Sequence, residues 1–187
     1  MYSQAEKKFI LQLARRAIEY YLESGSELEI KESEIPFSNL RQRAACFVTL
    51  TIQHKLRGCV GSLETVRPLY EDVIKNSLAA AFEDSRFTPL EKEELKNILI
   101  EISILSSPKR LEYKDSSELL RLLRPSIDGV IIEKGSEGAT YLPQVWDELK
   151  KPEEFLSSLC LKAGLPEDEW KNGKLKVSTY IVEVISE

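Results

Sequence analysis

The stretch from residue 98 to residue 105 is the feature that most constrains the fold. Its isoleucines stand at every second position from Ile98 to Ile104, and the residues between them include Glu101 and Ser103. Successive side chains on a β-strand point to opposite faces, so this period of two predicts a strand with one strongly apolar face. An apolar face of this kind has to be buried against a second layer of structure. The remainder of the chain must supply that layer.

Amphipathic patterns elsewhere in the chain predict the helices of that layer. Ser3 and Glu6 form a capping box before apolar residues at helical spacing, which predicts a first helix that ends at Ser24-Gly25. Pro68 suits the first helical position before an apolar stripe that runs to Phe82, and this helix should pack on a sheet. Shorter helices are expected at residues 88–96, 116–123 and 152–164.

Further strands follow from alternation and from turn residues. They are expected at residues 46–52, at 127–133 with an interruption at Asp128-Gly129, at 139–142 after a hairpin loop, and at 175–185. Strands and helices do not alternate strictly along the chain. The predicted class is therefore α+β, a two-layer fold with a mainly antiparallel sheet and flanking helices.

Length and charge limit the class of protein. The 187 residues, 42% of them hydrophobic and 30% charged, suit one globular domain or two small subdomains that share a core. A formal net charge of -5 argues against a general binder of nucleic acid or anionic membranes. Residues 39–68 nevertheless carry five basic residues against one acid, which leaves a local charge of +4. Because this window has too few aromatic residues for base stacking, a small anion is its expected partner rather than nucleic acid.

The cysteines indicate a reducing compartment. Cys46, Cys59 and Cys160 are widely spaced and form no metal-ligand pattern with the single histidine, so no metal site is expected. No phosphate-binding glycine signature indicates a nucleotide cofactor, and the cofactor stays unknown. The N-terminal residues do not resemble a signal peptide, and no apolar run is long enough to cross a membrane. We therefore expect a cytoplasmic protein with reduced thiols and no membrane association.

The segment LRGCVG at residues 56–61 is the candidate functional motif. It places Cys59 between Gly58 and Gly61, and Arg57 directly precedes Gly58. Glycine is favoured where the backbone takes a positive φ or approaches another group closely, so we expect a tight connection followed by the start of a strand. Neighbouring cations favour the thiolate form of a cysteine.

Two interpretations of Cys59 remain open. The thiolate could be a nucleophile, a redox site or a point of covalent attachment. Alternatively, Cys59 is a small apolar residue between glycines that a bulge or close packing requires. A cysteine nucleophile normally needs a base, but on an extended strand His54 would lie on the opposite face, about 16 Å away. A Cys/His protease or acyltransferase is therefore not expected.

Arginine side chains provide further candidates for binding. Arg57 has a planar donor fork that suits a carboxylate or phosphate, and its structural alternative is an ion pair with Asp84 or Glu64. Asp84 and Arg86 either line a cleft or form a salt bridge that anchors Phe87 in the core.

Two positions later in the chain have structural as well as functional interpretations. Tyr141 could contribute a hydroxyl to a pocket rim, although a strand-to-helix junction explains the nearby Pro143 equally well. Asp128-Gly129 is interpreted as a backbone kink rather than as a base.

Six segments along the chain form a recognisable set: FVTL at 47–50, LRGCVG at 56–61, DSRF at 84–87, EISIL at 101–105, YLPQV at 141–145 and FLSSLCLKAGL at 155–165. Together and in this order they resemble one family, the AMMECR domain family, whose prokaryotic members are called AmmeMemoRadiSam system protein A. The resemblance covers nearly the whole chain. It implies a larger subdomain from residues 1–85 and 125–187, a smaller inserted one at about 86–124, and the motif cysteine near the cleft between them.

The resemblance implies partners rather than a reaction. Family members occur alongside a Memo-type protein, itself similar to non-haem iron dioxygenases, and a radical SAM enzyme, which suggests a shared modification pathway. This chain departs from the common pattern at Ser85, where prokaryotic members often have proline, and at Asp128, where they often have histidine. If that histidine serves a reaction, this chain lacks it.

Two functions from different classes follow. The first is a small enzyme or pocket protein that handles an anionic small molecule or a modified group at an LRGCVG cleft. Its catalytic residue would be Cys59, and its binding residues would be Arg57, Gly58, Gly61, Asp84, Arg86 and Tyr141. The second is a non-catalytic binding or scaffold partner of a Memo-type protein and a radical SAM enzyme.

Overall fold

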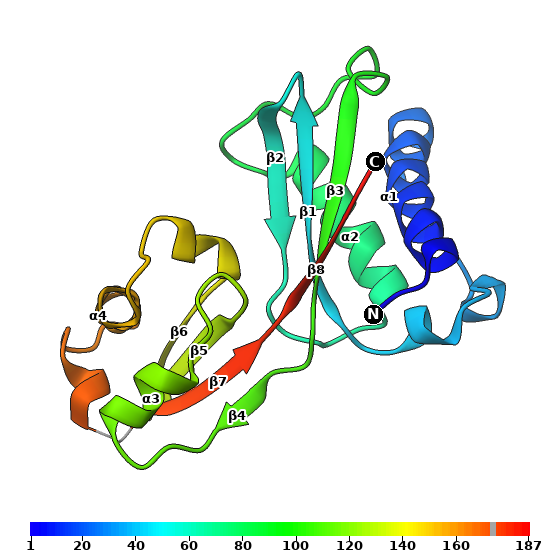
Figure 1. The fold of residues 1–187 in the computed structure, drawn as a ribbon. Helices are drawn as coiled ribbons and strands as arrows, with labels where there is room; N and C mark the ends of the chain where they lie inside the picture. The colour runs from blue at the N-terminus through cyan, green and yellow to red at the C-terminus, as the bar shows by residue number, and fades with distance from the viewer. Residues whose placement is uncertain (173–174) are drawn as a thin grey trace. The chain divides into compact units, whose positions relative to one another are not determined.

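A computed structural model describes residues 1–172 and 175–187 of the chain (Figure 1). The α-helices are α1 (Gln4–Ser24), α2 (Leu69–Phe82), α3 (Ser116–Leu122) and α4 (Pro152–Lys162). Short 3-10 helices are η1 (Glu32–Glu34), η2 (Ser38–Arg41), η3 (Pro143–Asp147) and η4 (Glu169–Asn172). The strands are β1 (Ala45–Ile52), β2 (Lys55–Gly61), β3 (Ile98–Leu105), β4 (Lys109–Leu111), β5 (Gly129–Lys134), β6 (Glu137–Tyr141), β7 (Lys176–Tyr180) and β8 (Val182–Ser186).

The chain divides into two compact units. The first unit holds Met1–Leu105 and Glu183–Glu187, and the second holds Ser106–Val182. These bounds differ from the expected subdomains. Residues 86–105 belong to the first unit because β3 pairs with β1, and residues 125–182 belong to the second because β5, β6 and β7 build its sheet.

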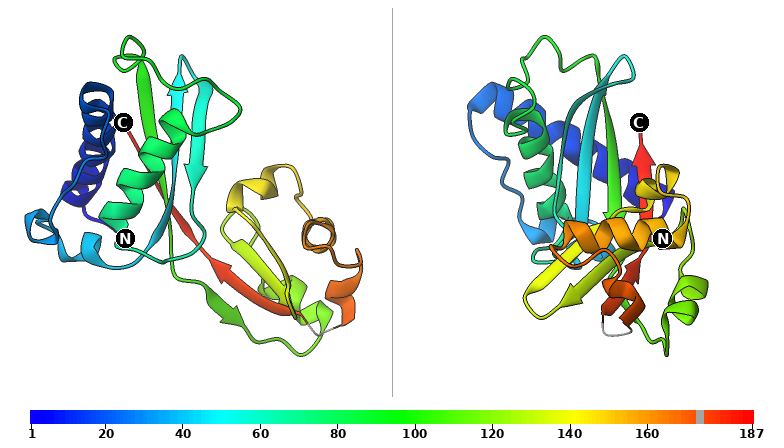
Figure 2. Two further views of the ribbon diagram at one scale, coloured as in Figure 1. Left: turned by 180° about the vertical axis from the view of Figure 1, so that it is seen from behind. Right: turned by 90° about the vertical axis from the view of Figure 1, so that its left-hand side faces the viewer.

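A four-stranded sheet in the order β2-β1-β3-β8 forms the centre of the first unit. Strand β1 pairs antiparallel with β2 and with β3. Helices α1 and α2 lie together on one face of this sheet (Figures 1 and 2). The isoleucines of β3 are buried in the core between this face and the two helices. The predicted strand is confirmed, as is the burial of its apolar face. Among the helices that the structure describes in this unit, none covers the opposite face of the sheet.

The first helix begins and ends where the sequence predicts. The Ser3 hydroxyl accepts a hydrogen bond from the Glu6 amide at 3.3 Å, and the Glu6 carboxylate accepts one from the Ser3 amide at 2.7 Å. Gly25 ends the helix with a left-handed φ of 69°. These caps satisfy backbone groups that have no partner within a helix. In α2, Pro68 is the N-cap residue, one position before the expected one.

The second unit has a sheet in the order β4-β7-β5-β6. Strands β5 and β6 form the expected antiparallel hairpin. Its core contains Trp146 and Phe155, whose rings stack with centroids 3.8 Å apart, and the α4 residues Leu156 and Leu159 pack in the same cluster. The unit therefore has a hydrophobic core of its own.

Three expected elements differ in the structure. Residues 88–96 form turns instead of a helix, because the Leu90 amide bonds to the Ala81 carbonyl at the end of α2. The strand expected at 127–133 begins at Gly129 and is not interrupted there. The expected last strand is two strands, β7 and β8, which separate at Ile181 and join different sheets.

Each unit combines an antiparallel sheet with helices, so the predicted α+β class is confirmed. Among the helices that the structure describes, none has the length and apolar character needed to cross a membrane.

Candidate functional site on strand β2

The LRGCVG segment lies within a continuous edge strand rather than in a turn. The tight connection precedes it, at Gln53 and His54, which take positive φ values of 51° and 62°. The pairing of β2 with β1 shifts register by one residue, because Leu50 pairs with Gly58 whereas Thr51 pairs with Leu56. This shift is a β-bulge at Arg57, and such a bulge redirects side chains and twists the strand.

Close packing explains both glycines of the motif. A Cβ atom at Gly58 would come within 2.0 Å of the Ala80 carbonyl oxygen on α2, and one at Gly61 would come within 2.3 Å of the Phe47 ring. Neither glycine has a positive φ. The sequence left two reasons for glycine open, a positive φ and the close approach of another group, and the structure supports close approach. The groups that approach are the Ala80 carbonyl and the Phe47 ring of the protein itself.

Asp84 and Arg86 hold the backbone of Cys59 from outside the sheet. The Cys59 amide donates to Asp84 Oδ2 at 2.8 Å, and Arg86 Nη2 donates to the Cys59 carbonyl at 3.3 Å. Two hydrogen bonds of 2.9 and 2.6 Å join the guanidinium of Arg86 to the Asp84 carboxylate. The Asp84–Arg86 pair therefore occupies both polar backbone groups that an edge strand would otherwise expose at this residue.

This pair also affects the ionisation of Asp84. The hydrogen bonds from Arg86, followed by the one from the Cys59 amide, hold the pKa of Asp84 well below its usual range. Asp84 therefore stays ionised as an acceptor for the Cys59 amide. The expected salt bridge is present, but Phe87 is only half-buried and does not belong to either core cluster.

The Cys59 thiol is part of a row of polar side chains across three strands. Thr49 on β1 pairs with Cys59 on β2 and with Glu101 on β3. Directly opposite residues place their side chains on the same face. Because Gly58 faces α2 and Val60 packs against the core, the row lies on the face that α1 and α2 leave open.

The hydroxyl of Thr49 donates to the Cys59 sulfur across 3.3 Å. Sequence reasoning missed Thr49 and Glu101. Alternation placed each of them on the outer face of its strand, but the register that aligns them with Cys59 cannot be read from alternation.

Arg57 is engaged by a partner that the sequence did not indicate. Its Nε and Nη2 atoms donate to the two carboxylate oxygens of Glu94 at 2.7 and 2.8 Å. The expected partners were Asp84 or Glu64. The hydrogen bonds from Arg57 are the main reason that the pKa of Glu94 is lowered. The guanidinium carbon of Arg57 also lies 6.0 Å from the centre of the Phe87 ring.

Two of the five basic residues in the 39–68 window are paired with acids. Arg57 binds Glu94, and Arg67 lies 3.5 Å from Asp72. Arg41 donates to the neutral Ile35 carbonyl. The two ion pairs therefore compensate half of the +4 charge that suggested an anion site.

Asp72 fixes the end of β2. This carboxylate is fully buried, and its Oδ2 atom accepts hydrogen bonds from the Cys46 amide, the Ser62 hydroxyl and the Asn76 amide group. The sequence indicated Asp72 only as an acid in the first turn of α2. Its hydrogen bonds instead join α2 to β1 and to the residue after Gly61.

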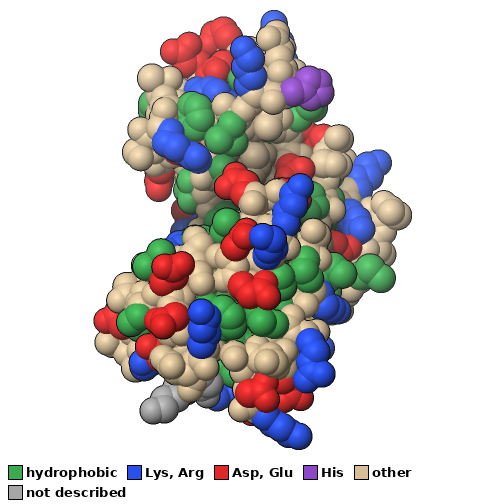
Figure 3. Space-filling model, turned by 60° about the vertical axis from the view of Figure 1, so that its left-hand side comes forward, with side chains coloured by type: hydrophobic (Ala, Val, Ile, Leu, Met, Phe, Trp, Pro, Cys, Tyr) green, Lys and Arg blue, Asp and Glu red, His purple; other side chains and the backbone are tan. Residues whose placement is uncertain are grey.

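The other thiols are less accessible than Cys59. Cys46 and Cys160 are buried, and burial is the main cause that raises the pKa of each. Cys59 is half-buried. The one histidine, coloured purple in Figure 3, is exposed. The continuous strand from Lys55 to Gly61 provides no turn that would bring His54 to Cys59.

Tyr141 and Asp128 belong to the second unit. The hydroxyl of Tyr141 is 2.9 Å from that of Ser158. Asp128 is buried, binds the Arg124 guanidinium at 2.6 Å and accepts a hydrogen bond from Trp146 at its carbonyl. These contacts give Asp128 a structural role in this chain. Within residues 1–172 and 175–187, no cluster of His, Cys, Asp and Glu could hold a metal ion.

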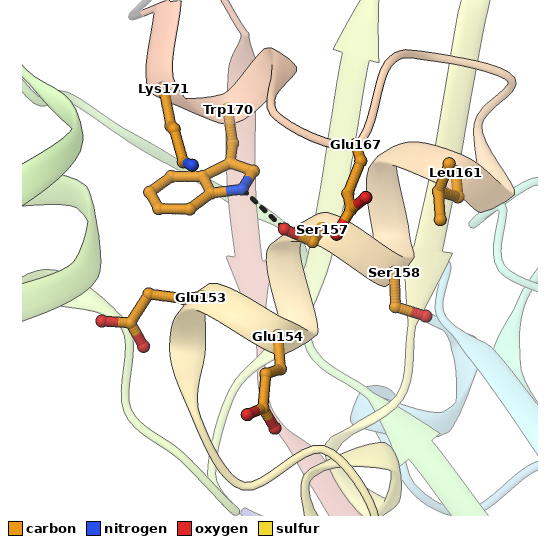
Figure 4. Close-up of a pocket in the computed structure, with 8 residues that line it drawn as sticks. All are labelled: Glu153, Glu154, Ser157, Ser158, Leu161, Glu167, Trp170 and Lys171. Carbon is orange, nitrogen blue, oxygen red and sulfur yellow. Dashed lines mark hydrogen bonds between the residues drawn. The ribbon is translucent and has the colours of Figure 1, made fainter.

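The second unit also contains an open pocket of about 370 Å³ (Figure 4). Three glutamates, Glu153, Glu154 and Glu167, line it with Trp170, whose indole donates to Ser157 at 3.0 Å. None of the candidate residues on β2 lines this pocket.

Fold and site define a class of two-unit α+β protein with a glycine-flanked thiol on a bulged edge strand. The AMMECR1 family model matches residues 11–185, and the chain belongs to this family. A relative from Thermofilum pendens is 39% identical, with 99% of this chain and 91% of the relative aligned. One from Thermococcus onnurineus is 40% identical over 96% of this chain and 89% of the relative. The crystal structure of protein PH0010 from Pyrococcus horikoshii matches with a TM-score of 0.82 at 37% identity, covering 99% of this chain and 93% of that protein.

Proposed function

We propose that the chain is a small enzyme or pocket protein that handles an anionic small molecule or a modified group through the Cys59 thiol. The observation that carries this proposal is the position of Cys59. It is half-buried whereas Cys46 and Cys160 are buried, and it points to the sheet face that α1 and α2 leave open. Asp84 and Arg86 bind the backbone amide and carbonyl of Cys59 at the outer edge of β2.

The neighbours of the thiol support a reactive role. A hydroxyl that donates to sulfur, as Thr49 does, stabilises negative charge on that sulfur. Glu101, opposite Thr49 on β3, is a carboxylate on the same face, but it lies two strand spacings, about 9.5 Å, from Cys59 across the sheet, too far to take a proton from the thiol directly. The row thus combines a thiol with a hydroxyl that donates to it.

Of the two arginines, Arg86 supports anion recognition better than Arg57. The Arg57 side chain is only 13% exposed, whereas that of Arg86 is 55% exposed. Each guanidinium makes a two-bond contact with a carboxylate, Arg57 with Glu94 and Arg86 with Asp84, so the difference in exposure decides between them.

Alkylation with iodoacetamide tests the role of the thiol. Native protein should gain one label, at Cys59, with Cys46 and Cys160 labelled only after unfolding, as measured by intact mass and peptide mapping. Thr49→Val should slow labelling of Cys59 by roughly fivefold, because it removes the hydroxyl that donates to sulfur. Thr51→Val, on the same strand, is the matched control. If Cys59 in the native protein resists labelling, or if Thr49→Val does not change its rate, the thiol has no reactive role.

A second function, a binding partner of a Memo-type protein and a radical SAM enzyme, is favoured by a different observation. Packing explains Gly58 and Gly61, and carboxylates bind Arg57 and Arg86, so these features need no substrate. Leu63, just after β2, is 43% exposed and could contact a protein. In a pull-down with both proteins, Arg86→Glu should abolish association if this function is the correct one. Unchanged association would exclude docking through this surface.

A further inference from the structure

The outer edge of β8 is an open hydrogen-bonding edge in the first unit. Strand β8 is the last strand in the order β2-β1-β3-β8, and it lies beside α1 (Figure 1). The Glu187 amide donates to the Ile100 carbonyl of β3. Backbone groups of an extended strand alternate in direction, so Val184 and Ser186 direct their amide and carbonyl groups away from β3. In the part of the chain that the structure describes, no strand of the first sheet lies on that side.

A groove of about 430 Å³ follows this edge. It lies between one side of α1 and the end of β8, and its large apolar lining residues are Leu11, Val184 and Ile185. Val184 is 48% exposed. The groove thus combines free backbone groups with an apolar surface, which are the two elements that bind an added strand.

The charged side chains that line the groove are mainly basic. Lys7, Lys8 and Arg15 line it with one carboxylate, Glu187. Arg15 is paired with Glu187 at 2.6 Å, and Lys7 with Glu183 at 2.8 Å. Lys8 is exposed, and none of the ion pairs among the described residues includes it. With these two pairs formed, Lys8 leaves one uncompensated positive charge at the groove, on a chain with a net charge of -5.

We propose that the outer edge of β8 binds an extended acidic segment of another protein as an added strand. The peptide groups of the segment pair with those of Val184 and Ser186. Its alternate side chains lie against Leu11 on α1, and its carboxylates lie near Lys8. The edge fits a segment of about five residues, the length of β8 itself.

The site is separate from β2 and does not depend on the proposed function of Cys59. At β2, Asp84 and Arg86 occupy the outward backbone groups of Cys59. Unprotected edges commonly pair with other chains. The unpaired Lys8 beside such an edge favours an acidic segment, because the charges are complementary.

Fluorescence anisotropy with a labelled peptide of alternating glutamate and valine, Glu-Val-Glu-Val-Glu-Val-Glu, tests the proposal. Val184→Pro removes the outward amide hydrogen without removing a hydrogen bond to β3, and should weaken binding at least tenfold. Val184→Thr keeps that amide and should stay within twofold of the unchanged protein. Lys8→Glu should weaken binding by about fivefold, and the loss should shrink at high salt. Circular dichroism and thermal melting identify any variant that fails to fold.

Three outcomes would overturn the proposal. One is that folded Val184→Pro binds the peptide as tightly as the unchanged protein does. If Val184→Pro does not fold, the same conclusion follows when an N-methylated peptide binds the unchanged protein as tightly as the ordinary peptide does. Another is equal binding of a peptide with lysine in place of glutamate. The third is a dimer in sedimentation equilibrium that Val184→Pro dissociates, because the edge would then pair with a second copy of the chain.

Discussion

The two outer strands of the first sheet expose their backbones to very different extents. On β2, the Cys59 amide and carbonyl are bound by Asp84 and Arg86. On β8, Val184 directs the same groups into a groove beside α1. The difference arises from the segment after α2, because Asp84 and Arg86 follow that helix closely and reach back to β2. One edge is therefore fixed by side chains, and the other is available for an added strand.

The largest effect is expected from Gly58→Ala, which tests how β2 is held. A Cβ atom at this position would lie 2.0 Å from the Ala80 carbonyl oxygen, and backbone cannot move away easily. We expect a loss of about 3 kcal/mol in the free energy of unfolding, measured with urea. Gly138→Ala is the control, because its nearest backbone atom is at 3.2 Å and a loss of roughly 1 kcal/mol is expected. Equal losses would mean that β2 does not depend on close contact with α2.

Removal of the Asp84 carboxylate should expose the β2 edge. Asp84→Ala deprives the Cys59 amide of its acceptor and Arg86 of its ion pair. Amide hydrogen exchange at Cys59 should accelerate by about tenfold, while exchange at Val184 stays unchanged. Asp84→Asn, which keeps an acceptor oxygen, should have a smaller effect. An unchanged exchange rate at Cys59 in Asp84→Ala would contradict the role assigned to this carboxylate.

The contact between Arg57 and Glu94 should contribute a smaller amount. A double-mutant cycle with Arg57→Ala and Glu94→Ala should give a coupling of about 1 kcal/mol, because the two-bond contact is only partly exposed. The exposed pair Lys151–Glu154 is the matched comparison and should couple by about 0.3 kcal/mol. Coupling as weak as that of the exposed pair would indicate that Arg57 is free to bind a ligand.

The smallest expected effect is the loss of the stability contributed by Asp84 at low pH. The pKa of Asp84 is lowered in the folded state, so its contribution to stability is complete above its unfolded value of about 4. That contribution is lost as the pH falls from there through the folded value. The difference in urea midpoint between unchanged protein and Asp84→Asn should therefore be constant from pH 7 to pH 5 and shrink below about pH 4. A difference that already shrinks between pH 7 and pH 5 would contradict the assignment.

The sequence predicted those parts of the fold that local patterns determine. The alternating isoleucines of β3 and the capping box at Ser3 were both confirmed. Local patterns failed where distant segments compete for hydrogen bonds. Residues 88–96 have a capping box, yet Glu94 binds Arg57 and Leu90 binds the end of α2.

The candidate site shows the same limit. Cys59 and its flanking glycines were visible in the sequence, but the roles of the glycines depend on Ala80 and Phe47, which lie elsewhere in the chain. Thr49 and Glu101 join Cys59 only through the register of three strands. Register depends on pairing between segments, which a pattern within one segment does not specify.

Hydrogen exchange at two amides, followed by NMR, tests the contrast between the edges most directly. In the unchanged protein, the Cys59 amide should be protected by at least about tenfold relative to the Val184 amide, because only the first has an acceptor in Asp84. Addition of the Glu-Val peptide should protect Val184 and leave Cys59 as it was. If the Val184 amide is as protected as the Cys59 amide before any peptide is added, the β8 edge is not open, and the contrast between the two edges is contradicted.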